Sequence, residues 1–188
     1  MKRQQLLLLI LAFGVFSILN TEMGIIGILP MAAEMYQVDI VQAGMLVSLF
    51  ALGVAIAGPT MPLLFSRFNR KHVMLLVLGV FTICNALAVV ASDFQLLLVL
   101  RVVPAFFHPV YCALAFSVAA ASVAPEDAPR AVARINMGVA AGMVVGVPIS
   151  NVLAATFDFS MAMVFFAGVT GLMFLLTMAF VPDLPVTQ

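Results

Sequence analysis

Three ionisable side chains, Glu22, Arg101 and His108, stand inside long apolar stretches of the sequence. Placing a charged side chain at the centre of a bilayer costs about 2.5–3.5 kcal/mol on insertion scales, so such residues usually face a bundle interior or a wet cavity. Glutamate and histidine can exchange protons, whereas arginine keeps its charge. This combination is typical of a proton-transfer site inside a membrane.

The spacing of these residues predicts which of them share a helix face or a membrane depth. Arg101 and His108 are seven positions apart and therefore share one helix face. At roughly 1.5 Å per residue, Glu22 and Arg101 reach a similar depth, which allows contact between them. Two interpretations fit this pattern. In one, Glu22 or His108 takes up and releases a proton beside Arg101; in the other, Glu22 and Arg101 form a structural ion pair and His108 is inert.

The composition requires a membrane around these residues. Hydrophobic residues make up 65% of the 188 positions and charged residues only 9%, and the mean hydropathy is +1.24. A span needs roughly 20 apolar residues. The sequence predicts one six-helix membrane domain over residues 1–188, with helices at about 6–33, 41–65, 73–91, 94–124, 135–155 and 160–181. Pro104 and Pro109 predict a kink in the fourth helix.

The basic residues predict the orientation of these helices. If the helices alternate in direction, one side carries seven of the eight basic residues: Lys2, Arg3, Arg67, Arg70, Lys71, Arg130 and Arg134. The opposite side carries Glu34, Asp39, Asp93 and Asp158 and no basic residue. Because basic loops stay in the cytoplasm, both termini are predicted to be cytoplasmic.

Small residues recur every four positions in the fifth predicted helix, at Gly138, Gly142, Gly146 and Ser150, with Pro148 interrupting the row. Such a stripe lets two helix backbones approach closely in a membrane. It predicts tight helix packing and specifies no chemistry.

Two other classes of six-helix membrane protein need sequence motifs that this chain does not contain. An intramembrane serine protease needs a Gly-x-Ser nucleophile, and a water channel needs Asn-Pro-Ala repeats; neither occurs in the sequence. Cys84 and Cys112 lack metal-ligand spacing. We therefore expect no enzymatic activity, no metal site and no nucleic-acid partner.

Four local patterns, each on a different part of the chain, resemble one transporter family. Residues 20–24 read Asn-Thr-Glu-Met-Gly, similar to an Asn-Thr-Glu-Phe signature, and residues 66–71 read Ser-Arg-Phe-Asn-Arg-Lys, similar to a loop motif Asp-Arg-x-Gly-Arg-Lys. Arg101 and the segment 138–148 resemble two further motifs. Together they resemble the amino-terminal half of a major facilitator superfamily transporter of the bacterial drug and sugar efflux branch.

This resemblance implies an all-α fold of two inverted three-helix repeats and proton-coupled export of a small molecule. The resemblance implies that the proton gradient drives transport and that no cofactor is needed. It also implies a location in the bacterial inner membrane. The implied proton-coupling and cavity residues are Glu22, Arg101, His108, Asn20 and Thr21. The implied cytoplasmic gate comprises Arg67, Arg70 and Lys71, and the antiporter motif comprises Gly138, Gly142, Gly146 and Pro148.

Two features of the sequence depart from the family pattern. Ser66 replaces an acid of the gate motif, and the chain has six predicted helices where the family has twelve. A complete cavity is therefore expected to need a homodimer or a second six-helix unit. The alternative is a non-transporting protein, either truncated or degenerate, or an isolated half that needs a partner. The sequence does not indicate the substrate.

Overall fold

The computed structural model describes residues 2–184. Within this range, six helical segments are long and apolar enough to cross a membrane, which confirms the predicted six-span architecture. These segments are Arg3–Tyr36, Ile40–Ala57, Arg70–Val89, Phe94–Ala121, Pro125–Thr156 and Phe159–Phe180. Three of them precede the turn at Ser92 and three follow it.

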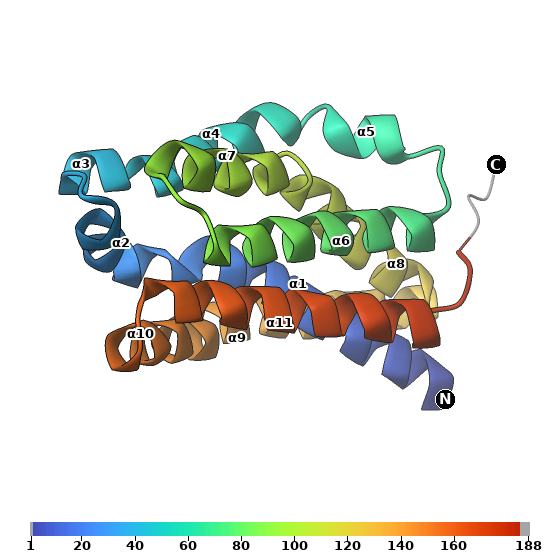
Figure 1. Cartoon of the computed structure of the whole chain (residues 1–188). Helices are drawn as coiled ribbons and strands as arrows, with labels where there is room; N and C mark the ends of the chain where they lie inside the picture. Colours follow the sequence, from blue (N-terminus) through green and yellow to red (C-terminus); the bar gives the residue numbers. More distant parts are fainter. Residues whose placement is uncertain (1, 185–188) are drawn as a thin grey trace.

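Several spans consist of more than one helix (Figure 1). The elements of the first three spans are α1 (Lys2–Gly24), η1 (Ile26–Ile28), α2 (Leu29–Tyr36), α3 (Ile40–Ala43), α4 (Met45–Ala57) and α6 (Arg70–Val89). The short helix α5 (Met61–Phe65) lies between the second and third spans. Those of the last three are α7 (Phe94–Ala105), α8 (His108–Ala121), η2 (Pro125–Asp127), α9 (Ala128–Ala141), η3 (Gly142–Gly146), α10 (Val147–Thr156) and α11 (Phe159–Phe180).

Prolines explain most of these interruptions, because proline lacks the backbone N–H that continues a helix. Pro30 lies in the first turn of α2, directly after the break that ends α1. The kink predicted in the fourth span lies at Phe106 and Phe107, between Pro104 and Pro109.

Three predicted helices differ from the structure. The first was expected over about residues 6–33, but it is divided into α1, η1 and α2. The second helix was expected to run unbroken over residues 41–65, but turns at residues 58–60 separate α4 from α5. The fifth helix was expected from residue 135 and instead begins at Ala128, in α9. Pro129 occupies the first turn of α9, where no intrahelical N–H bond is required, so the polar segment before residue 135 is compatible with a helix.

Side-chain caps start four of the helices and set the turns before them. The side chains of Asp39, Asn69, Asp93 and Asp158 accept hydrogen bonds from backbone N–H groups in the first turns of α3, α6, α7 and α11. The donor to acceptor distances are 2.7–3.0 Å. Asp and Asn are preferred N-caps because their short side chains satisfy otherwise unpaired N–H groups.

The start of α1 and the end of α11 lie at the same end of the bundle (Figure 1). At this end the Gln4 side chain donates a hydrogen bond to the Ser122 carbonyl, and the Arg70 N–H bonds to the Leu184 carbonyl at 3.1 Å. The opposite end is held by Tyr36, whose hydroxyl donates to the Ala91 carbonyl at 3.1 Å. The loops that carry most basic residues are therefore grouped at one end.

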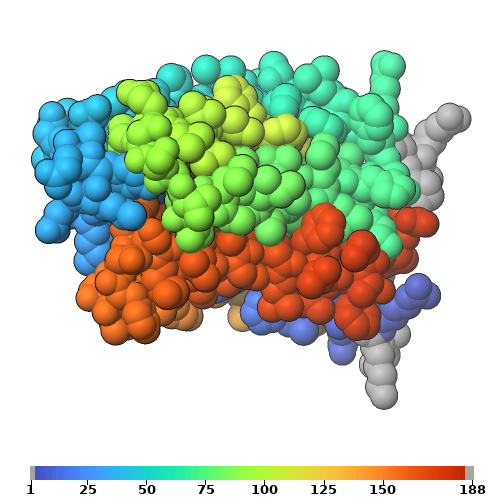
Figure 2. Space-filling model, in the orientation of Figure 1, coloured from blue at the N-terminus to red at the C-terminus, as the bar shows by residue number. Residues whose placement is uncertain are grey.

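Helix α1 packs against α8, α9 and α11 but keeps Leu9 and Phe13 exposed, while α6 and α11 run side by side along one face (Figures 1 and 2). Leu11, Val15 and Ile18 of α1 are almost fully buried. Large apolar side chains elsewhere are widely exposed, as expected of a surface that meets lipid or another helical unit.

Candidate functional site

Glu22 and His108 meet inside the bundle, where α1 ends and α8 begins. The Nε2 atom of His108 lies 2.8 Å from the Oε2 atom of Glu22, and their side chains are only 11% and 18% exposed. The contact has ion-pair distance without the geometry of a good hydrogen bond. It brings together two of the three ionisable residues predicted from the sequence, and both of them can exchange protons.

Arg101 does not form the ion pair with the Glu22 carboxylate that one of the two interpretations of the sequence offered. Its guanidinium donates to the backbone carbonyls of Thr21 and Glu22, the latter at 2.7 Å. A third N–H group reaches the Leu46 carbonyl at 3.4 Å.

The reason for this arrangement is the break in the first span. Helix α1 ends at Gly24, so the carbonyls of Thr21 and Glu22 lie in its last turn, where intrahelical partners run out and the helix dipole is negative. A buried cation with several donors can bond to these unpaired carbonyls and also offset the negative end of the helix dipole. Arg101 therefore caps α1 and fixes the backbone that carries Glu22.

The Phe50 ring of α4 packs against both Arg101 and His108. The Arg101 guanidinium carbon lies 4.7 Å from the centre of the Phe50 ring, and the His108 ring packs edge-on against it with centroids 5.9 Å apart. Phe50 is 2% exposed. Sequence reasoning missed this residue, because nothing in the sequence distinguishes it from the other phenylalanines. Its ring face attracts the Arg101 cation through a cation–π interaction.

The side chains of Asn20 and Thr21 lie between α1 and its neighbours, with Asn20 beside η3 and Thr21 beside α6. Thr21 donates to the Ser17 carbonyl at 3.1 Å and its hydroxyl lies 3.4 Å from the amide nitrogen of Asn85. Asn20 is fully buried, and its amide atoms have no hydrogen-bond partner within the described residues. A role for these two residues in a substrate cavity stays a prediction.

The glycine stripe of the fifth span packs on α1. A methyl group added at Gly138 would lie 2.9 Å from the Ala12 carbonyl carbon, and one at Gly142 would lie 3.1 Å from the Phe16 carbonyl oxygen. Gly142–Gly146 forms a short π-helix between α9 and α10, and Gly146 faces the Asn20 side chain. Only glycine allows this approach of two backbones. Pro148 is exposed in the first turn of α10.

The predicted gate residues lie on the turn between α5 and α6. Arg67 is exposed, and Arg70 and Lys71 are half-buried in the first turn of α6. Ser66, which stands where the family motif has an acid, donates to the Leu63 carbonyl at 2.7 Å. No acidic side chain forms a salt bridge with these basic residues within the described part of the chain.

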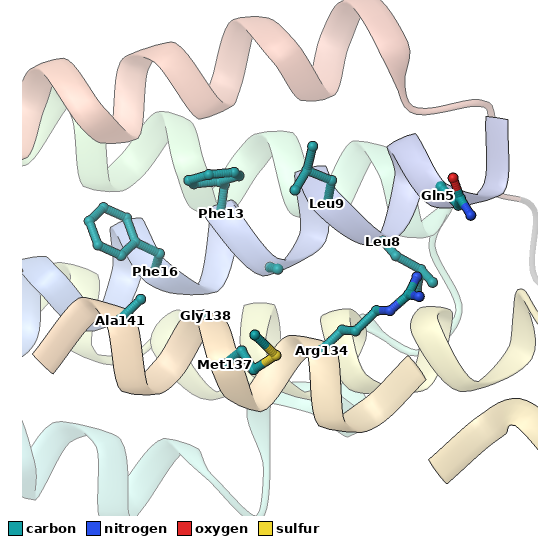
Figure 3. A pocket seen from close by; sticks show the side chains of 10 residues that line it. Gln5, Leu8, Leu9, Phe13, Phe16, Arg134, Met137, Gly138 and Ala141 are labelled. Atoms are coloured by element: carbon teal, nitrogen blue, oxygen red, sulfur yellow. The ribbon is translucent and has the colours of Figure 1, made fainter. Parts of the chain in front are cut away.

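An apolar groove of about 630 Å³ lies between α1 and α9 (Figure 3). Its lining residues are Gln5, Leu8, Leu9, Ala12, Phe13, Phe16, Arg134, Met137, Gly138 and Ala141. Figure 3 shows the Arg134 side chain extending along the groove toward Leu8. Over residues 2–184, no cluster of three metal-ligating side chains is present.

The family model described as Major Facilitator Superfamily matches residues 11–188 of this chain. The chain belongs to the major facilitator superfamily. This confirms the resemblance and identifies a transporter family, not an enzyme family.

Individual superfamily members agree with this assignment. The chain is 35% identical over 161 residues to the inner membrane transport protein YdhP of Escherichia coli strain K12. This alignment covers 86% of the chain and 41% of YdhP. It is 25% identical to a probable sugar efflux transporter of Helicobacter acinonychis strain Sheeba, over 94% of this chain and 45% of that protein.

A solved structure shows the same fold. The crystal structure of a bacterial homolog of the human lysosomal transporter Spinster, in an inward-facing and unoccupied conformation, superposes with a TM-score of 0.85 at 18% identity. The match covers 99% of this chain and 44% of that protein. The chain thus spans less than half the length of the superfamily members it matches.

Proposed function

We propose that this chain forms one half of a proton-coupled secondary transporter that exports a small molecule by alternating access. The observation that carries the proposal is the 2.8 Å contact between Glu22 and His108, next to the fixed charge of Arg101. Two groups that can exchange a proton lie in contact inside an apolar bundle. Membership of a transporter family supports transport, and the name of the Helicobacter relative supports export.

In this proposal Glu22 and His108 alternate between two charge states. When Glu22 is ionised and His108 is protonated, opposite charges hold α1 to α8. Proton transfer to Glu22 or loss of the His108 proton removes this attraction, which weakens the contact between the two helices. Arg101 remains charged throughout and holds the last turn of α1 through the carbonyls of Thr21 and Glu22.

The proposed transporter requires a second six-helix unit, either another copy of this chain or a separate partner. In the family fold the substrate lies between two such units. The widely exposed apolar side chains that line the α1 and α9 groove, including Leu9, Phe13 and Met137, supply a wall for that shared cavity. Native mass spectrometry in lipid nanodiscs measures the assembly directly.

We also propose that both termini face the cytoplasm of a bacterial inner membrane. The start of α1, the turn before α6 and the region from η2 to the start of α9 carry seven basic residues, and the hydrogen bonds at Gln4 and Arg70 group these loops at one end. The positive-inside rule places that end in the cytoplasm.

The test is proton movement in proteoliposomes that contain the chain in its native assembly. Vesicles carrying a pH-sensitive dye are given a transmembrane pH gradient and a library of amphipathic drugs, sugars and metabolites. We expect at least one compound to accelerate dissipation of the gradient, and Glu22→Gln to abolish that effect. Glu34→Gln, at an exposed acid of α2, is the matched control and should behave as wild type. Undiminished uphill export by Glu22→Gln refutes proton coupling through this residue.

A further inference from the structure

A second, polar cavity lies next to the apolar groove between α1 and α9, at the basic end of the bundle. The second cavity has a volume of about 170 Å³ and is lined by Gln4, Gln5, Leu8, Val123, Asp127, Arg130, Ala131 and Arg134. The two cavities share three lining residues, Gln5, Leu8 and Arg134. The two cavities are therefore neighbours, and we treat them as one joined site with an apolar body and a polar end.

The polar end carries a net positive charge. Arg130 and Arg134 are one helical turn apart on α9, and Asp127 lies on the same wall, so these three side chains sum to one positive charge. Neither arginine forms a salt bridge within the described residues, and Gln5 adds an exposed amide donor. The head of a bound molecule would thus meet one uncompensated positive charge and several hydrogen-bond donors.

The apolar part suits a chain or ring system. Leu9, Phe13 and Met137 present 52–70% of their surfaces to the groove or its surroundings, and no acidic side chain lines it. From Gln5 to Phe16 the groove follows α1 for about 16 Å, and it ends about 9 Å along the helix from Glu22. Its 630 Å³ falls within the roughly 300–1,000 Å³ typical of small-molecule sites.

We propose that this joined site binds a small amphipathic anion with a single negative charge, its head at Arg134 and Arg130 and its apolar body along Phe13, Phe16 and Met137. The inference names the substrate class of the proposed transporter and rests on that function. The occupant comes from solution and is not a bilayer phospholipid. An organic cation is disfavoured because its head would meet the arginine charge, and a neutral compound would gain no attraction from that charge.

Photo-crosslinking tests the proposal. The chain, in phosphatidylcholine nanodiscs at one pH and without a gradient, is labelled with a dodecanoate analogue that carries a diazirine, and the labelled peptides are mapped by mass spectrometry. We expect labels at Phe13, Phe16 and Met137, and displacement by unlabelled dodecanoate but not by dodecyltrimethylammonium. Arg134→Gln should weaken binding on the order of tenfold, whereas Arg134→Lys should retain most of it.

Arg3→Gln is the matched control, because Arg3 is an exposed basic residue of the same end that lines neither cavity. It should bind as wild type. Equal displacement by the cation, or equal labelling of the exposed apolar face of α11, overturns the proposal in favour of unspecific partitioning. Loss of labelling when phosphatidylglycerol replaces phosphatidylcholine identifies a bilayer lipid as the occupant and also overturns it. Because no gradient is present, these outcomes are independent of whether Glu22 couples protons.

Discussion

The Nε2 atom of His108 lies 2.8 Å from the Oε2 atom of Glu22, whereas Arg101 bonds to the backbone carbonyl of the same glutamate. One residue of the fourth span thus contacts the titratable group of the first span, and another holds its backbone. The charge of the Glu22 and His108 pair can change with protonation, whereas the charge of Arg101 is permanent. Substitutions at His108 and Arg101 should therefore have separate effects.

His108→Gln should alter proton coupling more than stability. The Glu22 carboxylate loses its partner inside the bundle, but it can bind a proton or accept a hydrogen bond from the new amide. We therefore expect a cost in the free energy of unfolding below the roughly 3–5 kcal/mol of an uncompensated buried charge. Transport driven by a pH gradient should fall at least severalfold. The same change at exposed His72 is the control. If His108→Gln lowers the melting temperature strongly and leaves coupling intact, the pair is only a structural link.

Arg101→Lys should destabilise the fold even though the charge is kept. A lysine ammonium cannot reach three carbonyls with the geometry of a guanidinium, and it stacks less well on Phe50. We expect a loss of about 2–3 kcal/mol, since a hydrogen bond to a charged group contributes about 1.5–3 kcal/mol. The measurement is thermal unfolding followed by circular dichroism, because the chain has no tryptophan. Exposed Arg3→Lys provides the comparison, and equal stability of the two variants would contradict the capping role.

The sequence predicted the spans, the glycine packing stripe and the three ionisable residues, because apolar length and charge inside an apolar run are local properties. It did not predict which partner each charge would take. An ion pair between Arg101 and Glu22 was one of two open interpretations. Arg101 instead caps the end of α1, and the position of that helix end depends on three-dimensional packing around Pro30. The contribution of Phe50 was equally hidden, because a phenylalanine in a span carries no signal of its neighbours.

Gly138→Leu should weaken the packing of α9 on α1. Its side chain would meet the Ala12 backbone, which cannot move without displacing α1. Overpacking of this kind costs about 1–3 kcal/mol, and here the backbone contact favours the upper end. Gly168→Ala in α11 is the control, because no heavy atom lies within 4 Å of the added methyl group. It should be neutral or stabilise by up to about 1 kcal/mol. Similar melting curves for the two variants would refute the packing interpretation.

Cysteine labelling from each side of the membrane should reveal one orientation. In a background with Cys84 and Cys112 replaced by serine, cysteines at exposed Arg67 and Glu126 should react only with a reagent present in the cytoplasm. A cysteine at exposed Ser92 should react only from outside. The basic residues on the loops of one end determine this arrangement. Reaction of all three sites from the same face would exclude six alternating spans.

Infrared difference spectroscopy of the Glu22 carboxyl group tests proton exchange most directly. Spectra of the reconstituted chain are compared between about pH 5.5 and 8, the range in which histidine and coupled groups normally change charge. The account predicts a carboxylic acid band that appears at the lower pH, disappears in Glu22→Gln, changes its pH midpoint in His108→Gln and persists in Glu34→Gln. A spectrum that Glu22→Gln leaves unchanged across this range would contradict proton uptake by Glu22.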